Sequence, residues 1–205
     1  MLLSSKKHSD PIIIEEVFTS NHSASDTFSQ QLLNDINYCK VKNQKSCHLI
    51  VFVHGFQATS VDLAKFRNFV WKLLPLVSCL ISKSNEADTH ASIEQLGLNL
   101  ATEVKLHLHR YFENRTDKLK KISFIGHSLG GIITREALKH LGKYADVMHG
   151  FVSLGSPHLG YMYNSSGLVD AGMWMLQKWK NSKSLQQLSM TDSKDYRDSF
   201  LYRLS

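Results

Sequence analysis

At residues 124–131 the chain reads Phe124-Ile125-Gly126-His127-Ser128-Leu129-Gly130-Gly131. An apolar run over Lys121–Ile125 precedes this stretch and a helix-forming run follows it, so we predict an abrupt turn from a buried strand into a helix. A serine at such a turn is held in a strained backbone conformation, and side chains two residues away would collide across it. Gly126 and Gly130 remove those collisions, and Gly131 adds a small residue where the helix nears its strand. We therefore predict that Ser128 is presented as a nucleophile.

A serine nucleophile needs donors for the oxyanion that forms during its attack, and two backbone amides are candidates. One belongs to Leu129, directly after the serine. The other belongs to Phe56, in the run Val53-His54-Gly55-Phe56 that follows an earlier apolar strand. The Gly-x-Ser-x-Gly pattern is weak by itself, but the two motifs in this order are far more specific than either one.

From Cys47 onward, short β-branched runs alternate with longer helical stretches, which is typical of a parallel α/β sheet with helices on both faces. The expected strands are Leu49–Val53, Leu76–Ile81, Ile122–Ile125 and Val147–Leu154. The expected helices are Val61–Leu74, Ala91–Phe112, Leu129–Leu141, Leu168–Trp179 and Ser184–Leu188. We expect one α/β domain over residues 47–205. Residues 1–46 are expected to form an extension that is partly loop, with Ile12–Ile14 as a candidate strand.

Three segments carry a resemblance to a known family: Val51–Phe56, Phe124–Gly131 and Ser153-Leu154-Gly155-Ser156-Pro157-His158-Leu159-Gly160. With them the chain resembles the lipase-like serine esterase domain of the α/β-hydrolase superfamily, from about Leu49 to its last residue. The resemblance implies an α/β-hydrolase-type, mostly parallel sheet and an acyl pocket lined in part by the third segment. The implied site consists of the nucleophile Ser128, oxyanion-hole residues Phe56 and Leu129, glycines Gly55, Gly126, Gly130 and Gly131, and pocket residues His54, His127 and His158.

The remaining partners of a catalytic triad are missing from the pattern. In this fold the acid and then the histidine follow the serine, each after a later strand, and only one clear strand follows Ser128. His158 belongs to the pocket segment and is a weak candidate for the base. Asp170, Asp192, Asp195 and Asp198 fit helix caps or solvated charges better than a triad acid. We therefore expect a sheet that is incomplete at its C-terminal side, from a truncated chain or an inactive one.

Composition limits the other roles. The chain has 205 residues and a net charge of +6, a mild bias toward anionic partners such as a membrane surface. A peripheral membrane contact stays open, because the apolar, aromatic stretch Met173–Trp179 is as compatible with a lid as with core packing. The histidines of Leu106-His107-Leu108-His109 point to different helix faces, so we expect neither a metal nor a cofactor. We expect no nucleic-acid partner, and the chain does not indicate an oligomeric state.

Three cysteines, Cys39, Cys47 and Cys79, lack metal spacing, and the first residues lack the apolar stretch of a secretory signal. We therefore expect reduced thiols and a cytoplasmic protein. The resulting hypothesis is a serine hydrolase that cleaves carboxylic, lipid-like esters through an acyl-Ser128 intermediate. The alternative is a catalytically inactive or truncated module of the same fold that engages a lipid or protein partner.

Overall fold

The computed structural model describes residues 47–74, 77–112, 119–160 and 182–205. The chain divides into two units, residues 1–38 and 39–205, and every described residue belongs to the second. The candidate strand Ile12–Ile14 and the expected helix Leu168–Trp179 lie outside the described residues, as does the first residue of the expected strand Leu76–Ile81.

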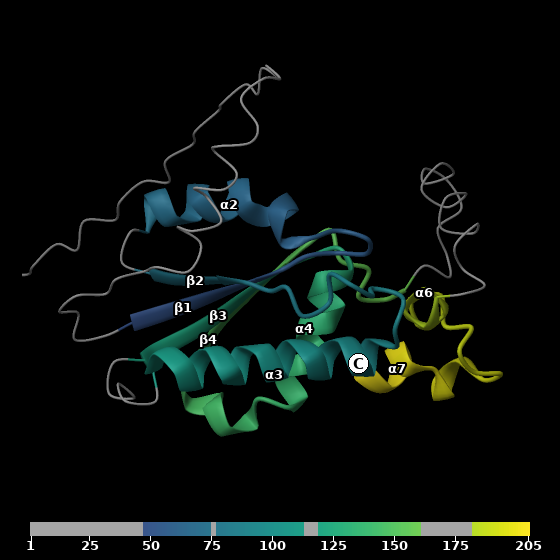
Figure 1. The fold of residues 1–205 in the computed structure, drawn as a ribbon. Helices are drawn as coiled ribbons and strands as arrows, with labels where there is room; N and C mark the ends of the chain where they lie inside the picture. Colours follow the sequence, from purple (N-terminus) through teal and green to yellow (C-terminus); the bar gives the residue numbers. More distant parts are fainter. Residues whose placement is uncertain (1–46, 75–76, 113–118, 161–181) are drawn as a thin grey trace, which may run out of the picture. The chain divides into compact units, whose positions relative to one another are not determined.

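Among the described residues, four parallel strands form one sheet in the order β2-β1-β3-β4 (Figure 1). The strands are β1 (Cys47–Val53), β2 (Val77–Ile81), β3 (Leu119–His127) and β4 (Met148–Leu154). Val53 pairs with Gly126, and His127 pairs with Leu154. The loops after β1, β3 and β4 therefore leave the sheet at the same end, the carboxyl end of its parallel strands.

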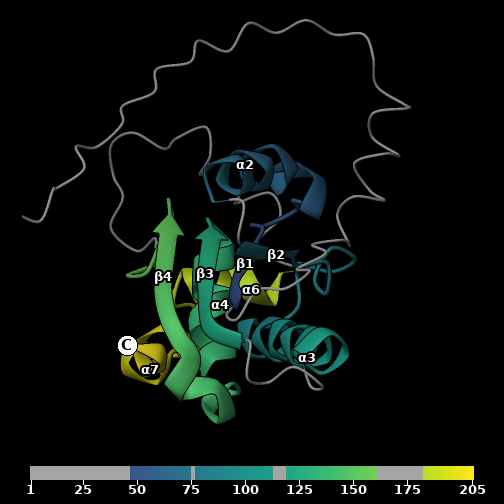
Figure 2. The same ribbon diagram turned by 90° about the vertical axis from the view of Figure 1, so that its left-hand side faces the viewer.

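Helices lie on both faces of the sheet, as the sequence predicts. One face is covered by α2 (Ser60–Leu73), and the other by α3 (Ile93–Phe112) and α4 (Leu129–Lys139), as Figure 2 shows end-on. Alternation along β1 supplies both layers: Phe52 contacts the ring of Phe66 on α2, and its neighbours Val51 and Val53 join the core beneath α3 and α4. The remaining elements are η2 (Gly142–Val147), α6 (Lys183–Leu188), η3 (Tyr196–Asp198) and α7 (Phe200–Leu204).

The last strand, β4, is the most exposed of the described strands. Most of β4 is exposed, with Val152 at 50% of its full exposure and Phe151 and Leu154 also accessible. The physical reason is its position, because β4 is at the edge of the described sheet and pairs there only with β3. Cys79 is half-buried in β2, the strand at the other edge of the described sheet.

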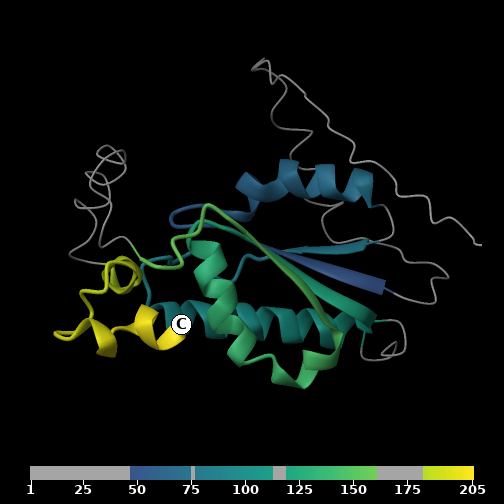
Figure 3. The same cartoon turned by 180° about the vertical axis from the view of Figure 1, so that it is seen from behind.

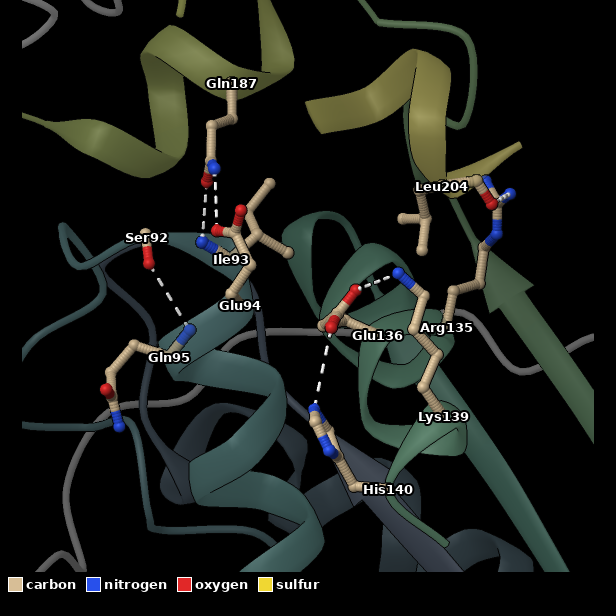
Figure 4. Close-up of polar contacts among 10 residues, drawn as sticks. All are labelled: Ser92, Ile93, Glu94, Gln95, Arg135, Glu136, Lys139, His140, Gln187 and Leu204. Carbon is tan, nitrogen blue, oxygen red and sulfur yellow. Dashed lines mark hydrogen bonds and ion pairs between the residues drawn. The ribbon is translucent and has the colours of Figure 1, made fainter. Parts of the chain in front are cut away.

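The contact between α3 and α4 depends on Gly97. A Cβ atom placed on Gly97 would lie 2.7 Å from Glu136 Cβ and 3.1 Å from the backbone nitrogen of Ala137. The Glu136 side chain is buried by this approach, and its carboxylate pairs with Lys139 at 2.8 Å and His140 at 3.6 Å (Figure 4). The helix that follows Ser128 therefore packs against α3 at a position, Gly97, where no side chain fits.

We predict that Gly97→Ala lowers the free energy of unfolding by about 1–3 kcal/mol, because α3 and α4 must separate to admit the methyl group. The loss is expected even though alanine is favoured over glycine within a helix by about 1 kcal/mol. Gly142→Ala is the matched control, since no atom lies within 4 Å of its added Cβ. Urea unfolding measures both variants, and equal stabilities would contradict the packing described for Gly97.

We also predict that the exposed edge at β4 makes the chain self-associate, since unpaired strand edges template further pairing. Val152→Lys is expected to raise the concentration at which association begins several-fold, by placing a charge on the edge. Val61→Lys, a similar change at an exposed position of α2, is the control. Light scattering against concentration measures the effect, and a wild-type chain that stays monomeric would refute the prediction.

Candidate active site

Ser128 lies at a strained turn between β3 and α4. Its backbone angles are φ 53° and ψ −124°, a conformation that costs a residue with a side chain on the order of 1–3 kcal/mol. Two hydrogen bonds hold it: the Ser128 amide donates to the Leu154 carbonyl at 2.9 Å, and the Gly131 amide donates to the Ser128 carbonyl at 3.2 Å. The strain is therefore stabilised by β4 on one side and the first turn of α4 on the other.

The glycines around Ser128 lie where backbone meets backbone. A Cβ on Gly126 would be 2.6 Å from Gly131 Cα, and one on Gly130 would be 2.6 Å from the His54 carbonyl oxygen and closer still to that of Val53. Gly131 faces Ser153 Oγ, 2.7 Å from its added Cβ. The start of α4 thus rests directly on the ends of β1, β3 and β4, and larger residues would push Ser128 away from them.

The loop after β1 lies beside Ser128. A Cβ on Gly55 would be 2.9 Å from Ser128 Cβ and 3.4 Å from Ser128 Oγ, so the loop passes in contact with the serine side chain. Phe56 follows it directly and packs against the hydrophobic core. On the other side Leu129 is the first residue of α4, where the helix supplies no acceptor for its amide. The two predicted oxyanion donors therefore flank one serine.

The predicted pocket histidines have different surroundings. His54 is buried, with Nδ1 3.0 Å from the Gly55 carbonyl oxygen, whereas His127 is exposed at the end of β3. His158 Nε2 lies 2.7 Å from Ser153 Oγ, and its Nδ1 has a long contact of 3.5 Å to Arg135. Burial, and secondly the positive charge of Arg135, lower the pKa of His158. His158 is thus a neutral partner of Ser153.

No hydrogen bond joins Ser128 Oγ to any described residue. The acids of the tail have other tasks: Asp192 accepts from the amide of Phe200 at 2.8 Å, and Asp195 from that of Arg197 at 2.9 Å. Asp170 lies outside the described residues. The described residues contain no cluster of three or more His, Cys, Asp or Glu side chains placed to hold a metal ion.

Gln57, Thr89 and His90 also lie at the carboxyl end of the strands, in the loops after β1 and β2, and the sequence did not identify them. The ring of His90 meets that of Phe56 edge-on at 4.8 Å, and Gln57 hydrogen-bonds both Thr89 and His90. Their position in the sequence could have indicated them. Thr89 and His90 lie in the loop after β2, and ligand-binding loops in parallel sheets follow the carboxyl ends of the strands.

Within the described parts of the chain, no helix combines the length and the apolar composition needed to cross a bilayer. Among solved structures, the mature lipase BlEst2 of Bacillus licheniformis is similar, with a TM-score of 0.51 and 21% identity. That match covers 82% of this chain and 66% of the lipase. At this identity the likeness establishes the shared α/β-hydrolase fold.

Two curated proteins of Saccharomyces cerevisiae are similar in sequence. Putative lipase YDL109C is 32% identical over 145 residues, covering 65% of this chain and 21% of that protein. Putative lipase ROG1 is 26% identical over 174 residues, covering 79% of this chain and 24% of that protein. The chain thus matches only about a fifth to a quarter of the length of these relatives.

A family described as Putative serine esterase (DUF676) matches residues 43–205. Because that match takes in most of the chain and all of its described strands, the protein belongs to this family of lipase-like α/β-hydrolases.

Proposed function

We propose that the protein is a serine hydrolase that cleaves carboxylic esters through an acyl-enzyme intermediate on Ser128. One observation carries the proposal: the Gly55-Phe56 loop touches the side chain of Ser128 at a strained turn. A nucleophile placed between a loop amide and a helix N-terminal amide, at the carboxyl end of a parallel sheet, is the arrangement that acyl transfer needs. The strain also supports a role for the serine side chain, because glycine adopts this backbone conformation at a lower cost.

The chemistry follows from this arrangement. Ser128 Oγ forms a bond to the ester carbonyl carbon, and the carbonyl electron pair moves onto its oxygen. The amides of Phe56 and Leu129 donate hydrogen bonds to that oxyanion. When the intermediate collapses, the ester C–O bond breaks and the alcohol leaves with a proton. Water then attacks the acyl group and releases the carboxylic acid, which regenerates the Ser128 hydroxyl.

A base must accept the Ser128 proton during this attack. Among the described residues, none of the histidines hydrogen-bonds Ser128 Oγ, and His158 is engaged by Ser153. We therefore assign the base to none of them. The same observation favours the second candidate function, a catalytically inactive module that keeps the turn for structural reasons and binds a lipid or protein partner.

We propose an apolar, lipid-like acyl group as the substrate's reacting part. The yeast relatives carry the name lipase, which supports this choice. The strand beside the site supports it too, because Leu154, whose carbonyl accepts from the Ser128 amide, and Val152 are accessible on β4. Apolar side chains that remain in contact with water beside a nucleophile suit a ligand that covers them, and also suit a peripheral contact with a membrane.

The test is covalent labelling of the full-length gene product with a fluorophosphonate probe, which phosphonylates activated serines. We expect wild-type protein to be labelled and Ser128→Ala to lose the label, with hydrolysis of short p-nitrophenyl esters falling on the order of 1000-fold or more. Ser153→Ala is the matched control, because Ser153 Oγ lies 2.7 Å from His158 Nε2 near the end of β4.

The control variant distinguishes Ser128 from Ser153 as the nucleophile, and the wild-type protein distinguishes the two candidate functions. Label retained in Ser128→Ala but lost in Ser153→Ala would move the nucleophile to Ser153. If the wild-type protein is neither labelled nor active on esters, the hydrolase proposal fails and the inactive binding module stands.

A further inference from the structure

Besides Ser128, a second strained residue lies in the loop that would supply the Phe56 amide. Gln57 has φ 52°, a left-handed conformation in which residues other than glycine are uncommon. Its amide donates to Thr89 Oγ1 at 3.0 Å, and the Ala58 amide donates to the Gly55 carbonyl at 3.3 Å. The first contact joins residues from different loops. The backbone of the turn that follows Phe56 is therefore anchored to the Thr89 hydroxyl, which comes from another loop.

Thr89 is itself held in place from the side of the sheet. It is only 4% exposed and ends the polar loop that follows β2. The start of that loop is fixed by the Ser82 amide, which donates to the Phe52 carbonyl at 2.9 Å. Its middle is fixed by Asn85, whose amide group donates to the Leu96 carbonyl at 3.0 Å. These contacts tie the loop to β1 and to α3.

Helix α6 holds Thr89 from the opposite side. Ser184 Oγ donates to the Thr89 carbonyl at 2.7 Å, and the Lys183 amide donates to the His90 carbonyl at 2.9 Å. One turn further on, Gln187 accepts from the Ile93 amide at 2.6 Å and donates to Glu94 at 2.7 Å (Figure 4). Seen from behind in Figure 3, α6 lies beyond the carboxyl ends of the strands. Thr89 is thus clamped between the sheet and the C-terminal part of the chain.

We infer that Thr89 is a positioning residue for the oxyanion hole: its hydroxyl holds the Phe56–Gln57 peptide so that the Phe56 amide stays aimed at the space beside Ser128. This inference rests on the proposed esterase function. The strained Gln57 turn relaxes when its acceptor is removed, and the neighbouring Phe56 amide moves with it. Because the oxyanion exists only during reaction, such a shift lowers kcat and leaves substrate binding unchanged.

The experiment compares Thr89→Val, which keeps the shape of the side chain and removes the acceptor, with Thr89→Ser, which retains it. Thr102→Val is the matched control, since Thr102 Oγ1 bonds only the Leu98 carbonyl within α3. For hydrolysis of p-nitrophenyl butyrate, we expect Thr89→Val to lower kcat about 10- to 100-fold, the size of effect that a displaced catalytic group produces. KM should change less than about twofold, and Thr89→Ser and Thr102→Val should match wild type.

Two further measurements keep the result interpretable. Hydrogen exchange at the Gln57 amide should accelerate at least about 10-fold in Thr89→Val and stay unchanged in Thr102→Val, because an amide exchanges when its hydrogen bond opens. Thr89→Ala removes the same acceptor without adding a methyl group to a buried site, and it must reproduce the kcat loss if the valine variant folds poorly.

The outcomes are distinct. An active wild-type protein whose Thr89→Val and Thr89→Ala variants keep their kcat, or lose activity through KM alone, overturns the role of Thr89 and leaves the esterase function intact. Unchanged exchange at Gln57 overturns the anchoring of the loop, whatever the activity. A wild-type protein without esterase activity overturns the proposed function, and the oxyanion role falls with it.

Discussion

The candidate site depends on how closely the first turn of α4 approaches the ends of the strands. Gly130 rests against the last carbonyls of β1, and Gly126 lies against Gly131 across the turn. This approach sets where Ser128 sits, forces its backbone out of the regions that ordinary residues prefer, and brings the loop after β1 into contact with its side chain. Packing of α3 against α4 through Gly97 maintains the same approach from the far side of the helix. Backbone proximity therefore underlies the site more than any polar interaction does.

Local pattern was enough to predict most of the fold. Apolar runs located all four described strands within a few residues, and the stripe Leu96, Leu100, Val104, Leu108 and Phe112 is buried along α3 as its spacing indicates. Pattern alone does not separate the half-buried edge strand β2 from the central strand β1, since an apolar run has the same appearance at the edge of a sheet as at its centre. Lateral position is a property of the whole sheet.

The site divides in the same way. The strand-to-helix turn at Ser128 and the loop after β1 could be located because each motif is short and follows a strand directly. Thr89 and His90 could not, because their contacts with Gln57 cross 32 and 33 residues and their contacts with α6 depend on how the tail docks. The hydrogen bond of His158, a weak candidate for the base by its sequence position, is to a serine five residues earlier on β4.

The docking of α6 also has a consequence for the order in which the protein acquires its structure. Ser184 and Thr89 are 95 residues apart, and Gln187 and Ile93 are 94 apart, so these contacts cannot form until α6 has been synthesised. During synthesis, the strands and the serine turn emerge from the ribosome before α6 does. A nascent chain can therefore complete its sheet while the loop beside Ser128 still lacks its outer support, and the site matures last.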